Sequence, residues 1–284
     1  MKRNMFGSAS WGFREFKLGE QLACACRLGF EIHELDIANA PGDLPVDADD
    51  GQLAEVRRLY ESYGIRLLCA ATGNDFSLAD ENLVRADLKK VKRVIDICEK
   101  VEAKYLRIFA GFSPCAEVTG ARWERMVKAL NETAEYAKSG GVVPCIETHG
   151  GVSTYPDGVE HFASVTTDYG CLQRLLSEVD DSVRFVYDPA NLYAAGVEEP
   201  EKISALLGDR ICCIHCKEFV VTPLGHLKPA ACGDTGMKWN DILGALGEFE
   251  GPVLMEYERT EDVEEGCRRS ADFLKKFKAV QKWR

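Results

Sequence analysis

The chain has 284 residues, and hydrophobic residues make up 46% of them, enough for a large buried core. No run approaches the roughly 20 consecutive apolar residues that a membrane-spanning helix needs. With 35 basic and 46 acidic residues the net charge is −11, so the surface as a whole repels phosphate backbones and we expect no nucleic-acid partner.

The opening residues 1–6 are basic, but glycine and serine follow before any signal-like apolar segment forms. We therefore expect a cytoplasmic protein, and we expect its twelve cysteines to be reduced, buried thiols. Cys213 and Cys216 have the C-x-x-C spacing of zinc and redox sites. Because residues three apart on a strand face opposite sides, we interpret these two as structural thiols.

Apolar strand-like runs alternate with amphipathic helices along the chain. In the first half, strands are predicted at 5–10, 30–35, 65–71 and 105–111, and helices at 18–28, 53–63, 80–101 and 123–137. In the second half, strands are predicted at 142–147, 183–188, 211–217 and 252–257, and helices at 170–179, 200–207, 240–249 and 263–280. The stretches 151–169 and 219–239 are expected to be loops, and the second is long enough to cover a site.

About eight β-α units without a proline- or serine-rich linker predict an α/β protein: a single-domain (β/α)8 TIM barrel over residues 1–284. A doubly wound sheet would need a phosphate-binding glycine loop after an early strand. The sequence has no such motif of the G-x-G-x-x-G or Walker type.

Four predicted strands in succession end in a residue that can bind a metal: Glu147, Asp188, His215 and Glu256. A single acid at a strand end is more often a helix cap or a loop residue. Four on consecutive strands favour a site, because catalytic groups of this fold lie at the C-terminal ends of the strands. Three carboxylates and one imidazole suit manganese or magnesium better than zinc.

Alternate strand residues face the barrel axis, so each inward residue predicts its neighbours two positions away. If Glu147 points inward, so do Cys145 and His149; if His215 does, so do Cys213 and Lys217. The same parity brings Glu34 and Arg107 to the mouth. Arg107 and Lys217 could equally be salt-bridge partners of the acids.

The remaining polar candidates are less well placed. Asn191 follows Asp188 by three residues, where forming a turn is as good an explanation as contacting a substrate. His33 has the wrong parity and is expected to be structural. His161 and His226 lie in predicted loops and are expected to be exposed, unless His226 enters the site together with its loop.

These residues stand in motifs that resemble those of the xylose isomerase-like barrel superfamily of sugar and sugar phosphate isomerases and epimerases. The motifs are Ile-Glu-Thr-His-Gly-Gly around Glu147, Asp-Pro-Ala-Asn-Leu from Asp188, His-Cys-Lys-Glu from His215 and Met-Glu-Tyr-Glu around Glu256. The resemblance extends over nearly the whole chain, from residues 29–35 to the terminal helix. Ketose 3-epimerases, however, carry His where Asn191 stands, which argues against that subgroup.

The resemblance implies that Glu147, Asp188, His215 and Glu256 bind one divalent cation, manganese or magnesium, with cobalt or zinc as alternatives. It implies that Glu147 and Glu256 also act as acid and base. Residues expected to contact the substrate or to support the ligands are Glu34, Arg107, His149, Asn191 and Lys217.

The predicted function is a metal-dependent sugar or sugar phosphate isomerase or epimerase that transfers a proton through an enediolate between Glu147 and Glu256. A lyase or dehydratase acting on a keto-sugar or inosose would use the same site, and a non-catalytic sugar-binding barrel is a further alternative. A trinuclear-zinc DNA-repair endonuclease of this fold would need more than the five histidines present. The expected partner is a small sugar, with a homo-oligomer left open.

Overall fold

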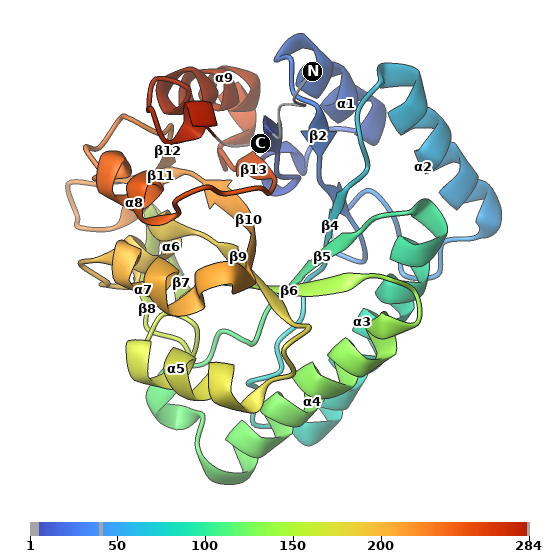
Figure 1. Cartoon of the computed structure of the whole chain (residues 1–284), viewed down its shortest axis with the longest axis vertical. Helices are drawn as coiled ribbons and strands as arrows, with labels where there is room; N and C mark the ends of the chain where they lie inside the picture. Colours follow the sequence, from blue (N-terminus) through green and yellow to red (C-terminus); the bar gives the residue numbers. More distant parts are fainter. Residues whose placement is uncertain (1–5, 40–41, 283–284) are drawn as a thin grey trace.

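The computed structural model describes residues 6–39 and 42–282. It confirms a single-domain parallel α/β barrel, with the strands in the middle and the helices around them (Figure 1). The wall strands are β1 (Phe6–Ser8), β2 (Ile32–His33), β3 (Leu35–Asp36), β4 (Cys69–Ala71), β5 (Tyr105–Ile108), β6 (Val143–Glu147), β9 (Arg184–Tyr187), β10 (Ile211–Cys216) and β13 (Val253–Met255).

The barrel closes through a wall strand that changes partner at Glu34. The sheet order is β2-β1-β13-β10-β9-β6-β5-β4-β3, and Glu34 alone separates β2 from β3. β2 pairs with β1, and β3 pairs with β4. The two segments therefore act as one strand that joins both ends of the sheet, so the wall has the eight strand positions of the predicted fold.

Helices follow the wall strands and cover them from outside (Figure 1). They are α1 (Leu18–Arg27), α2 (Asp50–Tyr63), α3 (Glu81–Val101), α4 (Gly120–Lys138), α5 (Tyr169–Glu178), α6 (Pro189–Ala194), α7 (Pro200–Leu207), α8 (Trp239–Ala245) and α9 (Val263–Leu274). The Asp80 side chain caps α3 by accepting from the Asn82 N–H. The six-residue helix α6 was not predicted, and the terminal helix ends at Leu274 instead of residue 280.

The hydrophobic core has two parts. One lies between strands and helices, and a smaller one fills the barrel: Ala9, Ile32, Cys69, Cys145, Val186, Cys213 and Leu254. Cys213 belongs to the inner part and Cys216 to the outer one, which confirms that the C-x-x-C thiols face opposite sides. All twelve cysteines are free, but Cys26 is exposed, so the expectation that every thiol is buried is wrong.

β10 contains a bulge near its start. Ile211 is opposite Phe185 on β9, and Cys213 is already opposite the next residue, Val186, so Cys212 is an extra residue. Beyond the bulge the register is regular, with His215 opposite Leu254 of β13.

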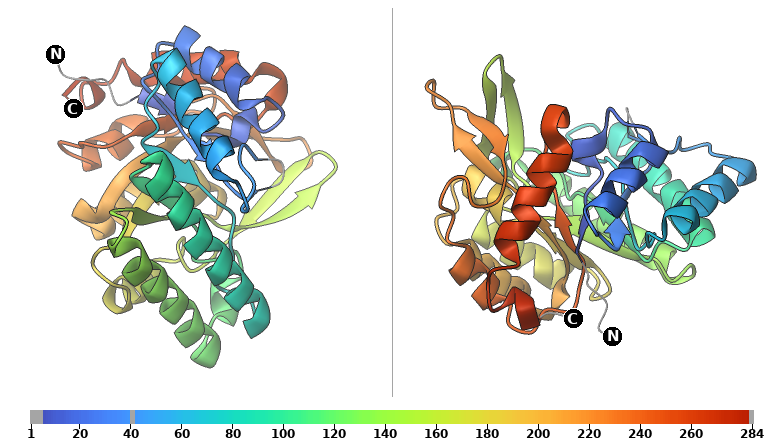
Figure 2. Two further views of the ribbon diagram at one scale, coloured as in Figure 1. Left: turned by 90° about the vertical axis from the view of Figure 1, so that its right-hand side faces the viewer. Right: turned by 90° about the horizontal axis from the view of Figure 1, so that it is seen from above.

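The two predicted loops prove to be β-hairpins. β7 (Gly151–Tyr155) pairs with β8 (Gly158–Phe162), and β11 (Glu218–Val221) pairs with β12 (Leu227–Ala230). The hairpins join through Leu227 and Val159 into an antiparallel sheet of order β11-β12-β8-β7, which we call the roof sheet. Figure 2 shows them projecting side by side from the barrel, and they leave it after β6 and β10, where the polar strand ends lie.

None of the helices within 6–39 and 42–282 is both long enough and apolar enough to cross a membrane.

Candidate active site

Four ligand-type side chains meet at the C-terminal ends of neighbouring barrel strands. Glu147 ends β6, Asp188 follows β9, His215 lies near the end of β10, and Glu256 follows β13. One nitrogen or oxygen atom from each lies within 4.8 Å of those of the other three, and all four residues are buried. We call these four residues the mouth cluster.

His215 has carboxylates around both ring nitrogens. Its Nδ1 lies 3.3 Å from Glu256 Oε2 and 3.6 Å from Glu147 Oε1, and its Nε2 lies 3.6 Å from Glu34 Oε1. Burial disfavours the charged ring, but these carboxylates outweigh burial and raise the pKa of His215 well above its ordinary value. In the metal-free protein, His215 is therefore an imidazolium that partly neutralises the acids.

Polar partners orient the Glu147 carboxylate through both of its oxygens. Asn191 Nδ2 donates to Oε1 at 3.0 Å, and Arg107 Nε lies 3.4 Å from Oε2. Burial and a second carboxylate raise the pKa of Glu147, yet His215 and Arg107 lower it more, so it stays below its ordinary value. Asn191 also donates its backbone N–H to Asp188 Oδ1 at 2.9 Å, so Asp188 caps α6 and Asn191 contacts two cluster residues.

Lys217 is the second cation beside the cluster. Its Nζ lies 2.7 Å from Glu256 Oε2, 2.6 Å from Glu258 Oε1 and 3.3 Å from Asp188 Oδ2. Burial lowers the pKa of Lys217, but these acids raise it more, so that the pKa of Lys217 lies well above its ordinary value. Burial raises the pKa of Glu256, but Lys217 and His215 lower it more, so that the pKa of Glu256 lies well below its usual range.

Glu34 lies behind His215 as seen from Glu147 and Glu256, since it faces the other ring nitrogen. The Ser10 N–H and hydroxyl both donate to Glu34 Oε2 at 3.2 Å. Burial raises the pKa of Glu34, but His215 and nearby Arg107 lower it below its ordinary value. A carboxylate in this position can fix the orientation of an imidazole that binds a metal through its other nitrogen.

The mouth cluster fits a divalent cation. Both His215 ring nitrogens and Asp188 Oδ2 are buried and make no hydrogen bond to the described residues, although such atoms are almost always bonded. Burial raises the pKa of Asp188 to about 7, because the nearby Lys217 charge offsets only part of the effect of burial on this carboxylate. A cation held by three carboxylates and one imidazole would engage Asp188 Oδ2 and one of the two His215 ring nitrogens, and this donor set suits manganese or magnesium.

A cavity of about 410 Å³ adjoins the cluster, and a volume of this size is typical of small-molecule sites. Its polar lining includes Arg107, Glu147, His149, His161, Lys217, Glu256 and Glu258. Its apolar lining includes Trp11, Phe109, Phe112, Val152 and Val159. Glu147 and Glu256 thus belong both to the cluster and to the cavity wall.

One face of the β7–β8 hairpin covers this cavity. Val152 is opposite His161 and Thr154 is opposite Val159, and all four line the cavity because alternate residues of a strand share a face. His149, predicted to point inward, also lines it and donates from Nδ1 to the Gly150 carbonyl at 2.5 Å.

The other histidines divide as follows. His33 is structural, as predicted, because its ring is bonded to Ser8 Oγ at 2.9 Å and Gln21 Oε1 at 2.7 Å. His226 lies between the hairpin turns, bonded to Asp157 at 2.5 Å, and it is not among the residues that line the cavity. His161 was expected in an exposed loop, but it lines the cavity because the loop is a hairpin.

Sequence reasoning also missed Glu258 and the aromatic residues Trp11, Phe109 and Phe112. Glu258 stands two residues after Glu256, so the parity rule that found Lys217 could have found it. The aromatic residues follow β1 and β5, and their composition alone does not distinguish a cavity wall from core.

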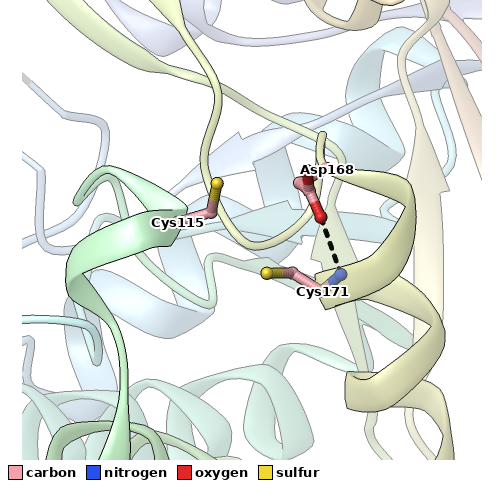
Figure 3. Close-up of side chains that lie close together, drawn as sticks. All are labelled: Cys115, Asp168 and Cys171. Atoms are coloured by element: carbon pink, nitrogen blue, oxygen red, sulfur yellow. Dashed lines mark hydrogen bonds between the residues drawn. The ribbon is translucent and has the colours of Figure 1, made fainter.

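A second group of ligand-type side chains lies outside the mouth cluster: Cys115, Asp168 and Cys171 (Figure 3). Asp168 Oδ1 accepts the Cys171 backbone N–H at 2.8 Å and thereby caps α5. Burial, together with Asp168, raises the pKa of the Cys171 thiol to about 12. The helix cap accounts for the carboxylate, and the thiol is protonated at neutral pH.

The model of the family described as Xylose isomerase-like TIM barrel matches residues 22–277. No curated protein sequence matches the chain at a significant level.

Several solved structures are similar to this one at low identity. D-psicose 3-epimerase with D-tagatose from Clostridium cellulolyticum H10 has a TM-score of 0.69 and 16% identity, covering 95% of this chain and 98% of its own. The probable 3-DHS dehydratase AsbF from Bacillus anthracis has a TM-score of 0.74 and 13% identity, with coverages of 95% and 98%. The 3-keto-D-glucoside 4-epimerase YcjR from E. coli has a TM-score of 0.71 and 15% identity, with coverages of 96% and 99%. Such identities establish the fold alone.

Proposed function

We propose that this chain, which belongs to the xylose isomerase-like TIM barrel family, is a metal-dependent enzyme that removes and returns a proton beside a sugar carbonyl. The main observation that supports this proposal is the buried mouth cluster next to a cavity of about 410 Å³. Isomerisation or epimerisation fits best, because two of the four cluster residues are glutamates that also line the cavity.

A divalent cation, manganese or magnesium, held by Glu147, Asp188, His215 and Glu256 would stabilise the negative charge that develops on the substrate oxygens. The chain's own groups supply the proton transfer. Both glutamates have lowered pKa values, so each is a carboxylate able to accept a proton at neutral pH.

The two glutamates have different partners, which supports different roles. Asn191 and Arg107 hold the Glu147 carboxylate, and neither of these side chains gives up a proton at neutral pH. Glu147 therefore stays unprotonated and is suited to accept the proton from the substrate carbon. Lys217 Nζ is 2.7 Å from Glu256 and holds this carboxylate by its charge. Glu256 would return to the substrate a proton taken up from solvent, while Glu147 releases the proton it removed to solvent. Return to the same carbon from the other face gives an epimer, and return to the neighbouring carbon gives an isomer.

Dehydration of a keto-sugar is the second candidate, and Lys217 favours it. Its ammonium group lines the cavity between Glu256 and Glu258, where it could protonate a departing hydroxyl after the same first proton removal. A non-catalytic sugar-binding barrel would have no need of the cluster of buried, partly unpaired ligand atoms.

Solvent exchange tests the proposed chemistry. The manganese-loaded protein is incubated in deuterated water with a panel of free ketoses, including D-fructose, D-psicose and D-tagatose. Proton transfer predicts deuterium on the carbon beside the carbonyl of the product, detected by NMR, whereas dehydration also yields an unsaturated or deoxy product. Turnover of a sugar without any solvent deuterium in the product would reject proton transfer and point to an internal hydride shift.

A further inference from the structure

His161 occupies a position in the roof sheet that no role assigned above explains. It lies on the face of β8 that covers the cavity, with ring centroids 5.6 Å from His149 and 5.2 Å from Phe219. Its Nδ1 atom is buried and has no hydrogen-bond partner among the described residues. The His161 side chain lines the cavity, and the described residues leave its buried Nδ1 without a hydrogen bond, so a ligand hydroxyl in the cavity could complete the hydrogen bonding of this ring.

The ring of His161 is neutral. Burial, assisted by His149 and Lys217, lowers the pKa of His161 to about 3. A neutral imidazole has one N–H donor and one nitrogen acceptor, and a hydroxyl group can engage either of them. A neutral ring offers no charge to an anionic group such as phosphate.

The cations that line the cavity are already paired. Arg107 lies 3.4 Å from a Glu147 oxygen and donates to the Thr72 carbonyl at 3.1 Å. Lys217 is shared by Asp188, Glu256 and Glu258. Among the described residues that line the cavity there is no further lysine or arginine. A phosphate group would therefore have to displace a carboxylate from one of these cations, against the repulsion of Glu258.

The rest of the wall is apolar. Trp11, Phe109 and Phe112 line the cavity together with Val152 and Val159 of the roof sheet. Aromatic rings combine a large apolar face with defined geometry and suit the C–H face of a sugar.

We propose that His161 forms a hydroxyl-binding subsite in the roof sheet, and that the substrate is an uncharged, unphosphorylated sugar whose hydroxyl bonds to it. The inference rests on the proposed function, since it names the substrate class of the same cavity. His161 is a binding residue and takes no part in the proton transfer.

The test uses His161→Phe, which keeps a flat ring against Phe219 but removes both nitrogens. The matched control is His33→Phe, which also replaces a buried histidine ring, but one whose two nitrogens are bonded to Ser8 and Gln21. We expect His161→Phe to leave the melting temperature unchanged or raise it, because its buried nitrogen had no partner to lose. His33→Phe should lower the melting temperature clearly, since it leaves Ser8 and Gln21 unpaired.

Sugar binding to the manganese-loaded protein is followed by intrinsic tryptophan fluorescence, to which Trp11 in the cavity wall contributes. The probes are D-fructose, D-psicose, D-tagatose and D-fructose 6-phosphate. We expect at least one free sugar to bind, D-fructose 6-phosphate to bind at least about tenfold more weakly, and His161→Phe to weaken binding of the free sugar about tenfold. Manganese affinity should change by less than about twofold.

Three outcomes would overturn the inference. They are equal or tighter binding of D-fructose 6-phosphate, failure of every free sugar to bind, and a loss of melting temperature in His161→Phe as large as in His33→Phe. Sugar binding that depends on His161 without any solvent deuterium in a turned-over product would instead reject the proposed proton transfer and leave this inference standing.

Discussion

The mouth cluster and the roof sheet face the same cavity but are built in opposite ways. The four cluster residues come from four neighbouring parallel strands and are at most 3% exposed. The roof sheet consists of two antiparallel hairpins, and Val221 and Leu224 near its tip are 70% and 75% exposed. Charged groups dominate the first region, and neutral or apolar groups dominate the cavity-facing side of the second.

Under the proposed function, chemistry and substrate recognition reside on separate elements of the fold. Moving a cluster residue would require a wall strand to move, and that strand is packed on both faces. The two hairpins pair with each other through Leu227 and Val159 and project from the barrel, so a hairpin can change without disturbing the wall. We expect substitutions in the two regions to affect different properties.

The largest effect is expected from Glu256→Gln. In the proposed mechanism Glu256 is both a proton-transferring carboxylate and a metal ligand, so activity should fall by more than the ~10²–10⁴-fold typical of one acid–base group. Steady-state kinetics at saturating manganese measures it. Glu258→Gln is the matched control, because it also removes a carboxylate partner of Lys217 but no cluster residue. Equal losses in both variants would show that Lys217 pairing, and not Glu256 itself, determines activity.

The next effect concerns the pH dependence of metal binding. Burial raises the pKa of Asp188 to about 7, and carboxylates raise that of His215 well above its ordinary value. Below these values the metal must displace a proton from each ligand, so affinity should rise with pH, by about tenfold per pH unit for each displaced proton.

Manganese titrations between about pH 5 and pH 8 measure this slope. Asp36→Asn is the control, because burial also raises the pKa of Asp36 to about 7 although it is not a cluster residue. The Asp36→Asn protein should keep the slope. A wild-type affinity that does not change with pH would contradict the proposed ligand set.

The smallest effect on the mouth cluster is expected from Asp157→Asn at the tip of the roof sheet. Asp157 accepts hydrogen bonds from His226 at 2.5 Å and from Thr222 at 2.7 Å, and thereby joins the two hairpin turns. Its loss should speed proteolytic cleavage in the turn that contains Leu224, while manganese affinity changes by less than about twofold.

Limited proteolysis with mass spectrometry locates the cut. Glu160→Gln serves as control, because the Glu160 side chain is bonded within its own hairpin, to Tyr155 at 2.9 Å. A large loss of manganese affinity in Asp157→Asn would show that the two regions are coupled.

The barrel and the mouth cluster were predictable because both follow from local rules. Strand periodicity and helix caps predicted the wall, and α3 was placed to within one residue. Once one inward residue is fixed, parity predicts its neighbours, and this rule brought His149 and Lys217 to the cavity.

The roof sheet was missed for two different reasons. The turn Pro156-Asp157-Gly158 between short β-branched segments is a hairpin signal that local reasoning could have used. The pairing of Leu227 with Val159, by contrast, joins residues far apart in sequence, and no local pattern encodes it. His161 was therefore assigned to an exposed loop, since its place in the cavity depends on that hairpin.

The bulge at Cys212 has a consequence for how this barrel can tolerate insertions and deletions. A one-residue change in the length of a strand normally exchanges its inward and outward side chains. In β10 the extra residue is accommodated before Cys213, so that His215 keeps its place opposite Leu254. The start of β10 is therefore a point where the chain can gain or lose a residue during evolution without turning His215 out of the mouth cluster.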